Sequence, residues 1–296
     1  MKVAVLLSTY NGNKYLNELL DSIYKQDLDG EIVVCIRDDG SKDNTRDIIL
    51  SWEGKINISL FEGENVGPRD SFKELLRNAP LCDYYAFCDQ DDIWHKDKLS
   101  SAVAMLQQQE ENVPVLYYCN TSLVDQNGNI LEYTRDNCKP KLKYENLIVQ
   151  NPALGCEMVF NNELRQIMER ITFDYYYMHD VVAIEVAALF GKIIYDMEPR
   201  MDYRQHIESV TQGHDRIKRF FDRIDFWFFQ NNISISKQAK EILQMYPDVK
   251  DKETLKSVSE YRNGINRFRF AFDKKFRSVD YKCNRSFVLR ILLGVA

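Results

Sequence analysis

The chain has 296 residues, enough to bury a substantial core as one large α/β domain or as a domain with a helical appendage. Its composition, 45% hydrophobic with only 12 Gly and 7 Pro, excludes a disordered or fibrous protein. The formal net charge of -6 argues against a protein that binds nucleic acid by general electrostatic attraction.

Four apolar segments, each followed by an amphipathic one, fill the first third of the chain. The runs KVAVLLS, EIVVCIR, INISLFE and DYYAFC predict strands at residues 2–8, 31–37, 56–62 and 83–88. Helical periodicity follows each strand, and after the first strand one stripe is formed by Tyr15, Leu16, Leu19, Leu20, Ile23 and Tyr24. Four strand–helix units in succession predict an α/β fold, with a Rossmann-like, mostly parallel sheet and helices on both faces.

Polar residues follow each predicted strand at its carboxyl end. In an open parallel sheet these ends share one edge, where loops converge and helix N-termini offer unpaired N–H groups to a ligand. We therefore expect one binding site there, formed by Ser8, Thr9, Asn11, Asp38, Asp39, Asn65, Gly67 and the segment Asp89 to Asp92. Because this edge is acidic rather than glycine-rich, a bound pyrophosphate needs a divalent cation between itself and the carboxylates.

The stretch FCDQDDIW places three carboxylates within four positions. Hard carboxylate oxygens suit Mg²⁺ or Mn²⁺, and substrate phosphates usually complete the shell of such an ion. Asp89 and Asp91 point to one side of an extended segment, so we assign Asp91 to the metal, and Asp89 to the metal, its water or a ribose hydroxyl. Asp92 is expected to point away and to brace the turn or cap the next helix. A solvated turn without a ligand is the alternative, which the position after the fourth strand disfavours.

Several motifs in this order carry a resemblance to a known family. LLSTYNG, IRDDGSKDNT, ENVG and FCDQDDIW resemble the nucleotide-sugar domain of family 2 glycosyltransferases with the GT-A fold, over roughly the first 210 residues. The CDQDD form is similar to bacterial rhamnosyltransferases of polysaccharide assembly. The resemblance implies inverting transfer of a sugar from a dTDP- or UDP-linked donor to an acceptor hydroxyl. It also implies that Ser8, Tyr10 and Asp39 hold the nucleobase and the ribose.

The loop after the third strand departs from the family pattern. Family members commonly continue the NxG motif with an Asn-Phe pair, but NVGPRDSF has Ser71 in that place. Arg69 in the same loop is either a phosphate contact or a surface charge. Asn65 and Gly67 are the residues that we expect to contact the donor from this loop.

The acceptor half must supply a general base, because a sugar hydroxyl is a poor nucleophile until its proton has somewhere to go. In YYYMHDVVAIEVAALFG, His179 and Asp180 precede a predicted helix that ends near Gly191. An Asp at a helix start is most often a cap, but the resemblance implies that an acidic residue at this place is the catalytic base. We therefore predict Asp180 as the base and His179 as an orienting or structural neighbour.

The segment YRQH resembles the same rhamnosyltransferase-like group. The resemblance implies that His206 completes the metal shell and that Arg204 meets the diphosphate. A hydrogen-bonded structural histidine is the alternative for His206. The QxxRW motif of processive members is absent from the sequence, so we expect a single transfer per encounter.

The chain from Asp215 onward is predicted to be helical and ends in a basic region. Aromatic residues crowd positions 220–229, where they either pack back on the GT-A domain or form a partner surface, for example in a homodimer. Between Arg267 and Arg290 there are eight Lys or Arg against two Asp, a local +6 that leaves -12 for the rest. Because these cations mix with Phe, Val, Leu and Ile, contact with an anionic membrane face and ordinary core packing both stay open.

These patterns predict the organisation and the compartment of the protein. We expect a GT-A glycosyltransferase domain at residues 1–212, with a nucleotide-sugar half at 1–119 and an acceptor half at 120–212, and a helical region at 213–296. Seven scattered Cys without CxxC pairs, a start without a signal peptide and the lack of an apolar run of about 18 to 20 residues predict a cytoplasmic protein. Peripheral contact with the inner face of the membrane would bring it to a lipid-linked saccharide acceptor.

Two hypotheses from other classes compete with a glycosyltransferase. A nucleotidyltransferase shares the sheet and the carboxylates, but it requires a glycine-rich basic loop where STYNGNKY supplies only Gly12 and Lys14. A non-catalytic sugar-binding or scaffold protein of the same fold does not need both Asp91 and Asp180.

Overall fold

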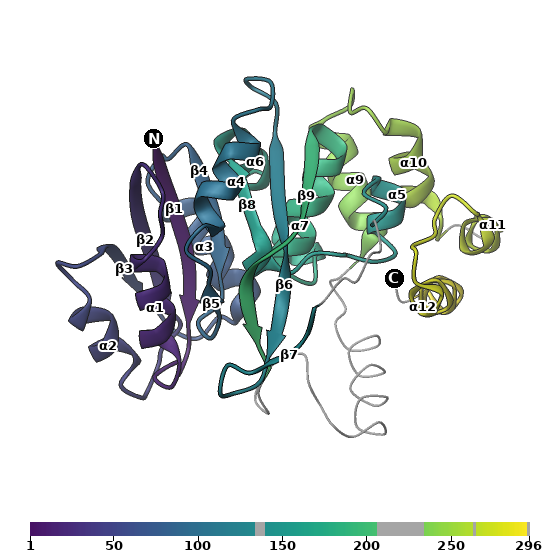
Figure 1. Ribbon diagram of the computed structural model, residues 1–296. Coiled ribbons are helices and arrows are strands. Elements are labelled where there is room, and N and C mark those ends of the chain that lie inside the picture. Colours follow the sequence, from purple (N-terminus) through teal and green to yellow (C-terminus); the bar gives the residue numbers. More distant parts are fainter. Residues whose placement is uncertain (134–139, 206–233, 263–264, 295–296) are drawn as a thin grey trace. The chain divides into compact units, whose positions relative to one another are not determined.

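The computed structural model of the chain describes residues 1–133, 140–205, 234–262 and 265–294 (Figure 1). These residues belong to two compact units, and each is described by itself. Unit 1 comprises Met1–Cys138, Ala153–Arg170 and Gly191–His206, and unit 2 comprises Lys139–Pro152, Ile171–Phe190 and Ile207–Ala296. The segment that carries Asp180 therefore groups with the C-terminal helices. The boundary predicted at residue 212 falls outside the described residues and stays a prediction.

The first half of unit 1 alternates strands and helices as predicted. Its elements are β1 (Lys2–Thr9), α1 (Leu16–Tyr24), β2 (Glu31–Asp38), α2 (Thr45–Ser51), β3 (Asn57–Glu62), α3 (Pro68–Asn78) and β4 (Tyr84–Cys88). The four strands are parallel in the order β3-β2-β1-β4, with Leu6 of β1 paired to Cys35 and Phe87 on either side. The carboxyl ends of these strands consequently share one edge.

The rest of unit 1 extends the same sheet with antiparallel and parallel pairs. Its elements are β5 (Ile93–Trp94), α4 (Lys98–Leu106), β6 (Val115–Val124), β7 (Ile130–Tyr133), η1 (Gly155–Glu157), β8 (Met158–Asn161), α6 (Asn162–Met168) and β9 (Lys192–Arg204). In the described residues the sheet has nine strands in the order β3-β2-β1-β4-β8-β6-β9-β5, with β7 paired to β6. Strand β8 runs antiparallel to β4 and β6, whereas β9 runs parallel to β6. The predicted α/β class, a sheet accompanied by helices, is confirmed.

Helices cover both faces of this sheet because successive strand residues point to opposite sides. Val5 and Leu7 of β1 join a core with the buried stripe of α1 and with α4. On the other face, Phe72 of α3 packs edge-on against Phe87 of β4, with ring centroids 5.5 Å apart. The predicted stripe of α1 is buried at Leu16, Leu19, Leu20 and Ile23, but Tyr24 at its end is exposed.

Unit 2 is helical in the ranges that the structure describes. Its elements are α5 (Tyr144–Leu147), η2 (Phe173–Tyr175), α7 (His179–Phe190), α9 (Ile235–Met245), α10 (Lys252–Glu260), α11 (Asn266–Phe272) and α12 (Tyr281–Leu293). Helix α7 is buried on nearly all sides, and its Leu189 shares a core with α9, α10, α11 and α12. The aromatic run at 220–229 lies outside the described residues. None of the helices in the described ranges combines the length and the apolar character that a membrane crossing requires.

Candidate active site

The loops after β1 and β4 meet at the carboxyl edge of the sheet. The Gln90 side chain accepts a hydrogen bond from the backbone N–H of Tyr10 (2.8 Å) and donates one to the Tyr10 carbonyl (3.0 Å). Gly12 makes room for this contact, since a Cβ there would lie 2.3 Å from Oε1 of Gln90. Ser8 Oγ lies 2.7 Å from Ser71 Oγ, which links β1 to α3. The structure thus brings together loops that are 80 residues apart in the chain.

Asp38 is the last residue of β2 and Asp39 follows it; both are buried. Asp38 accepts hydrogen bonds from Thr9 Oγ1 (2.9 Å) and from the N–H and hydroxyl of Ser41. Asn11 lies beside this turn with a positive φ of 48°, and its side-chain oxygen accepts from the Lys42 N–H. Asp38 therefore shapes the loops around the end of β1.

Asp39 shapes the loop after β3. Its oxygens accept from the N–H groups of Val66 and Gly67, both at 2.9 Å, and it pairs with the guanidinium of Arg37. Gly67 has a φ of 81°, which suits glycine and precedes Pro68 at the start of α3. Asn65 is exposed in the same loop. Contacts of these residues with a nucleobase stay predictions.

The loop Asp89–Asp92, which we call the acid loop, crowds carboxyl groups at the end of β4. Side-chain oxygens of Asp89 and Asp92 and the sulfur of Cys156 lie within 4.8 Å of one another. Burial, and then the neighbouring charge of Asp91, raises the pKa of Asp89 to about 7. Burial and the charges of Asp91 and Asp89 also raise the pKa of Asp92 well above its usual range. Among the described residues, neither side-chain oxygen of Asp92 has a hydrogen-bond partner at an ordinary distance and angle.

The position of Asp92 corrects the sequence-based expectation that it points away from Asp89. That expectation assumed an extended segment, in which alternate residues share a side. The chain instead turns at Gln90 and Asp91, and the turn returns Asp92 to Asp89. Asp91 itself is half-buried, and its assignment to the metal stays a prediction.

A buried lysine lies below the acid loop. The Lys98 ammonium, at the start of α4, donates to the carbonyl of Cys156 (2.7 Å) and lies 3.1 Å from the sulfur of Met201. It also stacks over the Trp94 ring, 4.8 Å from the centroid. Its charge lowers the pKa of both Asp89 and Asp92, against the effect of burial.

Lys98 and Cys156 were not among the site residues predicted from the sequence. The two residues come from α4 and η1, which follow the acid loop at different distances along the chain. No local motif marks either of them. A Lys at the start of an otherwise apolar helix was the available signal for Lys98, since an unpaired Lys is rarely buried.

Arg204 at the end of β9 holds the acid loop by its backbone. Its guanidinium is buried and donates to the carbonyls of Asp91 (3.1 Å) and Gln126 (3.0 Å) and to the carboxylate of Glu18 (2.6 Å). It also stacks on the Tyr15 ring, with the guanidinium carbon 4.6 Å from the centroid. Through these contacts the Arg204 side chain binds groups of the protein itself. Its predicted contact with a diphosphate stays a prediction. His206 lies outside the described residues.

Asp180 lies in unit 2, in the first turn of α7. Its Oδ1 accepts from the N–H of Val181 at 2.7 Å, and the residue is half-buried. His179 beside it is buried, and burial lowers its pKa to about 3, so its imidazole is neutral at physiological pH. A neutral, buried His179 fits its predicted role as a structural neighbour of Asp180. The role of Asp180 as the base stays a prediction.

The side chains of the acid loop fit a divalent cation. Two carboxylates lie close together, one of them fully buried and without a hydrogen-bond partner among the described residues. Burial keeps the pKa of the Cys156 thiol well above its usual value, so the thiol stays neutral and the carboxylates supply the oxygen ligands. Oxygen ligands of this kind suit Mg²⁺ or Mn²⁺.

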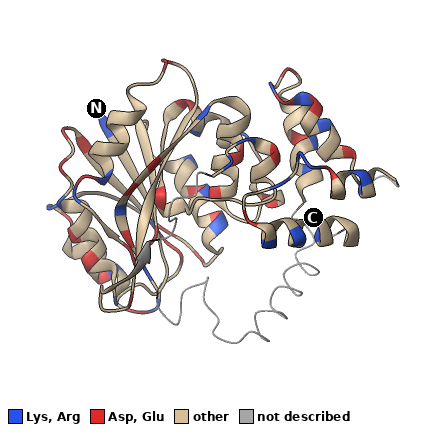
Figure 2. Ribbon diagram, turned by 45° about the vertical axis from the view of Figure 1, so that its right-hand side comes forward, with Lys and Arg blue, Asp and Glu red and all other residues tan. Residues whose placement is uncertain are grey.

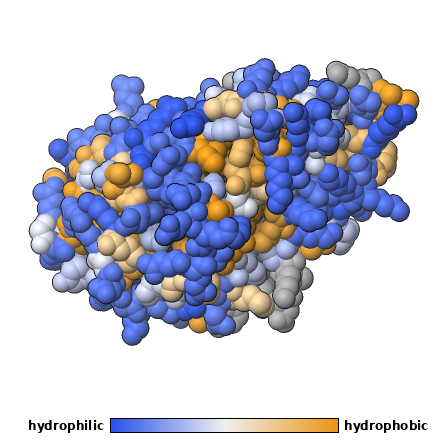
Figure 3. Space-filling view, turned by 90° about the horizontal axis from the view of Figure 1, so that it is seen from above, coloured by the Kyte–Doolittle hydropathy of each residue, from blue (hydrophilic) through white to orange (hydrophobic). Residues whose placement is uncertain are grey.

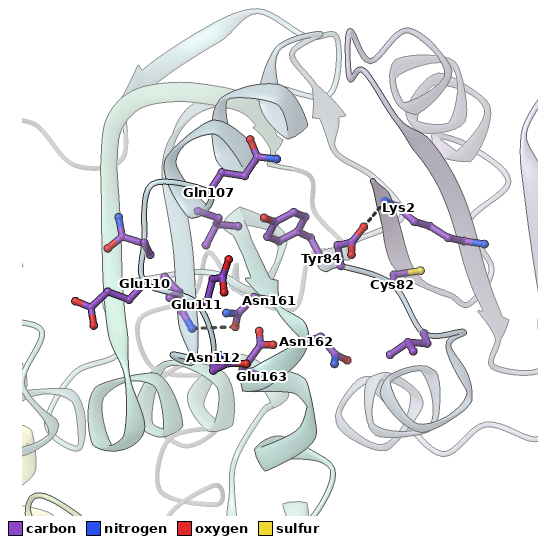
Figure 4. A pocket seen from close by; sticks show the side chains of 15 residues that line it. Lys2, Cys82, Tyr84, Gln107, Glu110, Glu111, Asn112, Asn161, Asn162 and Glu163 are labelled. Carbon is purple, nitrogen blue, oxygen red and sulfur yellow. Dashed lines mark hydrogen bonds between the residues drawn. The ribbon is translucent and has the colours of Figure 1, made fainter.

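A separate open hollow of about 710 Å³ lies at the opposite, amino end of the parallel strands. Figure 4 shows Lys2, Tyr84 and Asn161 at its wall, where Asp83 accepts from the N–H of Lys2 and Asn161 from that of Val115. The first residues of β1, β4 and β6 and the start of α6 line it, and its lining contains none of the predicted site residues that follow the parallel strands. We therefore take the carboxyl edge as the candidate active site.

The fold and this edge define an α/β protein of the GT-A kind. Residues 4–165 match the sequence profile of Glycosyl transferase family 2, so the chain belongs to that family and is a glycosyltransferase. The dTDP-rhamnosyl transferase RfbG of Shigella flexneri is 28% identical over 242 residues, which cover 74% of this chain and 78% of RfbG.

Solved structures confirm the fold. The crystal structure of Staphylococcus aureus TarS 1-349 in complex with UDP-GlcNAc superposes with a TM-score of 0.61 and 20% identity, covering 100% of this chain and 80% of that one. The mannosyltransferase PcManGT from Pyrobaculum calidifontis, in complex with GDP-Man and Mn²⁺, gives a TM-score of 0.54 and 16% identity, covering 99% and 86%. At these identities the likeness concerns the fold alone.

Proposed function

We propose that the chain is an inverting, metal-dependent glycosyltransferase of bacterial surface polysaccharide synthesis. It moves a sugar, rhamnose in the first instance, from a nucleoside diphosphate to a hydroxyl of a saccharide or lipid-linked acceptor on the cytoplasmic side of the membrane. The observation that supports this most is the crowding of Asp89 and Asp92 within 4.8 Å at the carboxyl edge of the sheet. Carboxyl groups placed so closely are stabilised by a cation.

In this mechanism the donor lies over the carboxyl edge of unit 1. Ser8, Tyr10 and Asp39 hold the nucleobase and ribose, and Asp89 and Asp91, with Asp92 beside them, hold the ion. When bound, a divalent ion offsets the charge that develops on the departing diphosphate. Arg204 keeps the acid loop in place through the Asp91 carbonyl.

Asp180 takes the proton of the acceptor hydroxyl. The acceptor oxygen then forms a bond to C1 of the sugar on the face opposite the diphosphate, and the bond from C1 to the diphosphate oxygen breaks. His206 is the further ligand proposed for the ion. One inverted linkage forms in each encounter.

The dTDP-linked donor is favoured by similarity to RfbG over most of both chains. A UDP-linked donor is the alternative, since TarS, which shares the fold, is solved with UDP-GlcNAc. Binding of dTDP, UDP and GDP, each titrated with and without Mn²⁺ and followed by assays of donor hydrolysis and transfer, decides between them. A nucleotidyltransferase would consume nucleoside triphosphates instead, and a sugar-binding scaffold would release no diphosphate.

Two substitutions test the assigned roles. Asp91→Asn is expected to abolish metal-dependent nucleotide binding, whereas Asp180→Asn spares binding and lowers transfer by about 100- to 10,000-fold. Asp29→Asn in unit 1 and Asp248→Asn in unit 2 are matched controls, since both residues are exposed. Wild-type transfer by Asp180→Asn, or wild-type metal-dependent binding by Asp91→Asn, contradicts the role assigned to that residue.

A further inference from the structure

Helices α11 and α12 carry apolar side chains on the outside of unit 2. Of the eighteen exposed large hydrophobic residues in the described ranges, seven fall between positions 265 and 293, each exposed by 47% to 68%. They are Ile265, Phe268, Phe272, Val279, Tyr281, Leu289 and Leu293. We call them, with the cations between them, the basic apolar face. Single exposed apolar residues are ordinary, but a cluster marks a surface that contacts something.

The helical spacing places these residues on continuous outer stripes. In α11, Phe268 and Phe272 are four residues apart on one side, while Phe270 and Ala271 are buried on the other. The preceding Ile265 continues the outer stripe. The fold of α11 thus buries one apolar side and leaves a second one exposed.

Helix α12 repeats this arrangement. Tyr281, Leu289 and Leu293 follow one exposed side, whereas Phe287 and Ile291 point into the core of unit 2. The inner side packs on α11, with the rings of Phe270 and Phe287 5.9 Å apart. The inner residues form the core of unit 2, and the outer ones are not part of it.

Cations are interleaved with the outer apolar residues. Eight Lys or Arg and two Asp lie between Arg267 and Arg290, so this segment is +6 in a chain of net charge -6, although the Nε of Arg290 is buried rather than on the face. Lys282 and Arg285 are exposed along the same side of α12 as Tyr281 and Leu289. Figure 2 shows the blue cations along the helix that ends at the mark C, and Figure 3 shows apolar atoms at the right-hand end of the view, where Figure 1 places α11.

We propose that the basic apolar face binds a membrane surface that carries anionic lipid headgroups. Apolar side chains on such a face enter the boundary between headgroups and acyl chains, while Lys and Arg extend along them to the lipid phosphates. Charge complementarity selects this occupant, because the positive charge of the face is opposed to that of the rest of the chain and matches an anionic bilayer. The inference rests on the proposed function. It deepens that function, because binding to the membrane would bring the enzyme to a lipid-linked acceptor.

The test is co-sedimentation of the full chain with vesicles of phosphatidylcholine alone, or with about 30% phosphatidylglycerol. We expect binding to the anionic vesicles, and binding at least about tenfold weaker to neutral ones and at about 0.5 M salt. Lys282→Glu with Arg285→Glu, and separately Phe268→Ser with Phe272→Ser, should each weaken binding at least about tenfold.

Matched controls come from exposed residues of unit 1. Leu81→Ser removes an apolar residue that is 73% exposed, and Lys25→Glu reverses a charge whose side chain is 65% exposed; both should leave vesicle binding unchanged. The melting temperature of each variant verifies that it is folded. Equal binding by face variants and controls, or no preference for anionic vesicles, overturns the proposal.

Two further readouts separate this inference from the proposed function and from self-association. Nucleotide binding and donor hydrolysis by the face variants should equal those of the wild type, so loss of vesicle binding alone concerns only the membrane surface. If the protein ignores vesicles but forms a dimer that the face variants dissociate in sedimentation equilibrium, the face binds a second copy and the membrane proposal is wrong.

Discussion

Unit 1 and unit 2 each contain a buried carboxyl group. Asp92 in unit 1 is 1% exposed, and Glu185 in unit 2 is 2% exposed. Burial raises the pKa of both, that of Glu185 to about 8. Around Asp92 neighbouring groups also act: the charges of Asp91 and Asp89 raise its pKa further, whereas the nearby neutral thiol of Cys156 and the charge of the Lys98 ammonium lower it. Burial alone acts on Glu185.

The difference separates a carboxyl group that is prepared for a ligand from one that is part of a core. Glu185 lies in the interior of α7, near the buried Tyr144, and a protonated carboxyl there is neutral and needs no ion. Asp92 lies in a loop at the edge of a sheet, where the like charges of Asp91 and Asp89 and the buried Lys98 ammonium all act on it. Perturbed groups of this second kind are typical of functional sites, whereas a perturbed pKa alone is not sufficient.

The largest expected effect comes from removing the cation below the acid loop. Lys98→Met should lower the free energy of unfolding by about 4 kcal/mol near pH 8.5, above the pKa of about 7 of Asp89, because the ionised Asp89 then loses a buried positive charge. Urea unfolding and Mn²⁺-dependent nucleotide binding measure the result. Asp89→Asn added to Lys98→Met should restore most of the stability at that pH, since the uncompensated charge is then gone. If Lys98→Met alone is as stable as the wild type, the charge of Lys98 does not stabilise the acid loop and does not distinguish Asp92 from Glu185.

The next largest effect concerns Glu185. Its folded pKa of about 8 lies above its usual 4.5, so the folded state holds the proton more tightly and the stability of the wild type falls as pH rises through that range. Glu185→Gln cannot ionise, and should be about 2 kcal/mol more stable than the wild type near pH 8.5 but similar near pH 4. Unfolding curves across this range verify it, with the exposed Glu111→Gln as a control. Parallel pH profiles for wild type and Glu185→Gln would show that Glu185 is not a neutral core residue.

A smaller effect is expected where the backbone of the acid loop is held. Arg204→Lys keeps the charge but cannot reach Glu18 and the carbonyls of Asp91 and Gln126 together. Mn²⁺-dependent nucleotide affinity should fall about tenfold, or about 1.4 kcal/mol, with a smaller change in the turnover of bound donor. The control is Arg46→Lys, because Arg46 pairs with Glu62 on the surface. An unchanged affinity would mean that the acid loop does not depend on Arg204.

The sequence was sufficient to predict much of unit 1. Strand periodicity predicts β1, β2, β3 and β4, and parallel strands bring their polar carboxyl ends to one edge whatever the details of the loops. The surroundings of Asp92 were not predictable, because they depend on the turn at Gln90 and on residues from α4 and η1 that no local pattern connects to it. The grouping of α7 with the C-terminal helices was also not predictable from local patterns, since it depends on contacts such as those of Leu189, far apart in the chain.

The smallest effect tests whether burial decides how much a group with a raised pKa changes the free energy of unfolding. His95 and Asp202 pair at 2.9 Å between β5 and β9, with 34% and 24% of their side chains exposed. The hydrogen bond to Asp202 raises the pKa of His95 despite burial, so the pair stabilises the fold fully below pH 6.5 and loses this contribution as pH rises through the raised pKa. Water screens a pair this exposed, and His95→Gln should change the free energy of unfolding by less than about 1 kcal/mol near pH 6 and by less still near pH 8. The Glu185 and His95 contributions thus both weaken with rising pH but differ in size, and a larger change for His95→Gln than for Glu185→Gln would show that burial is not what separates them.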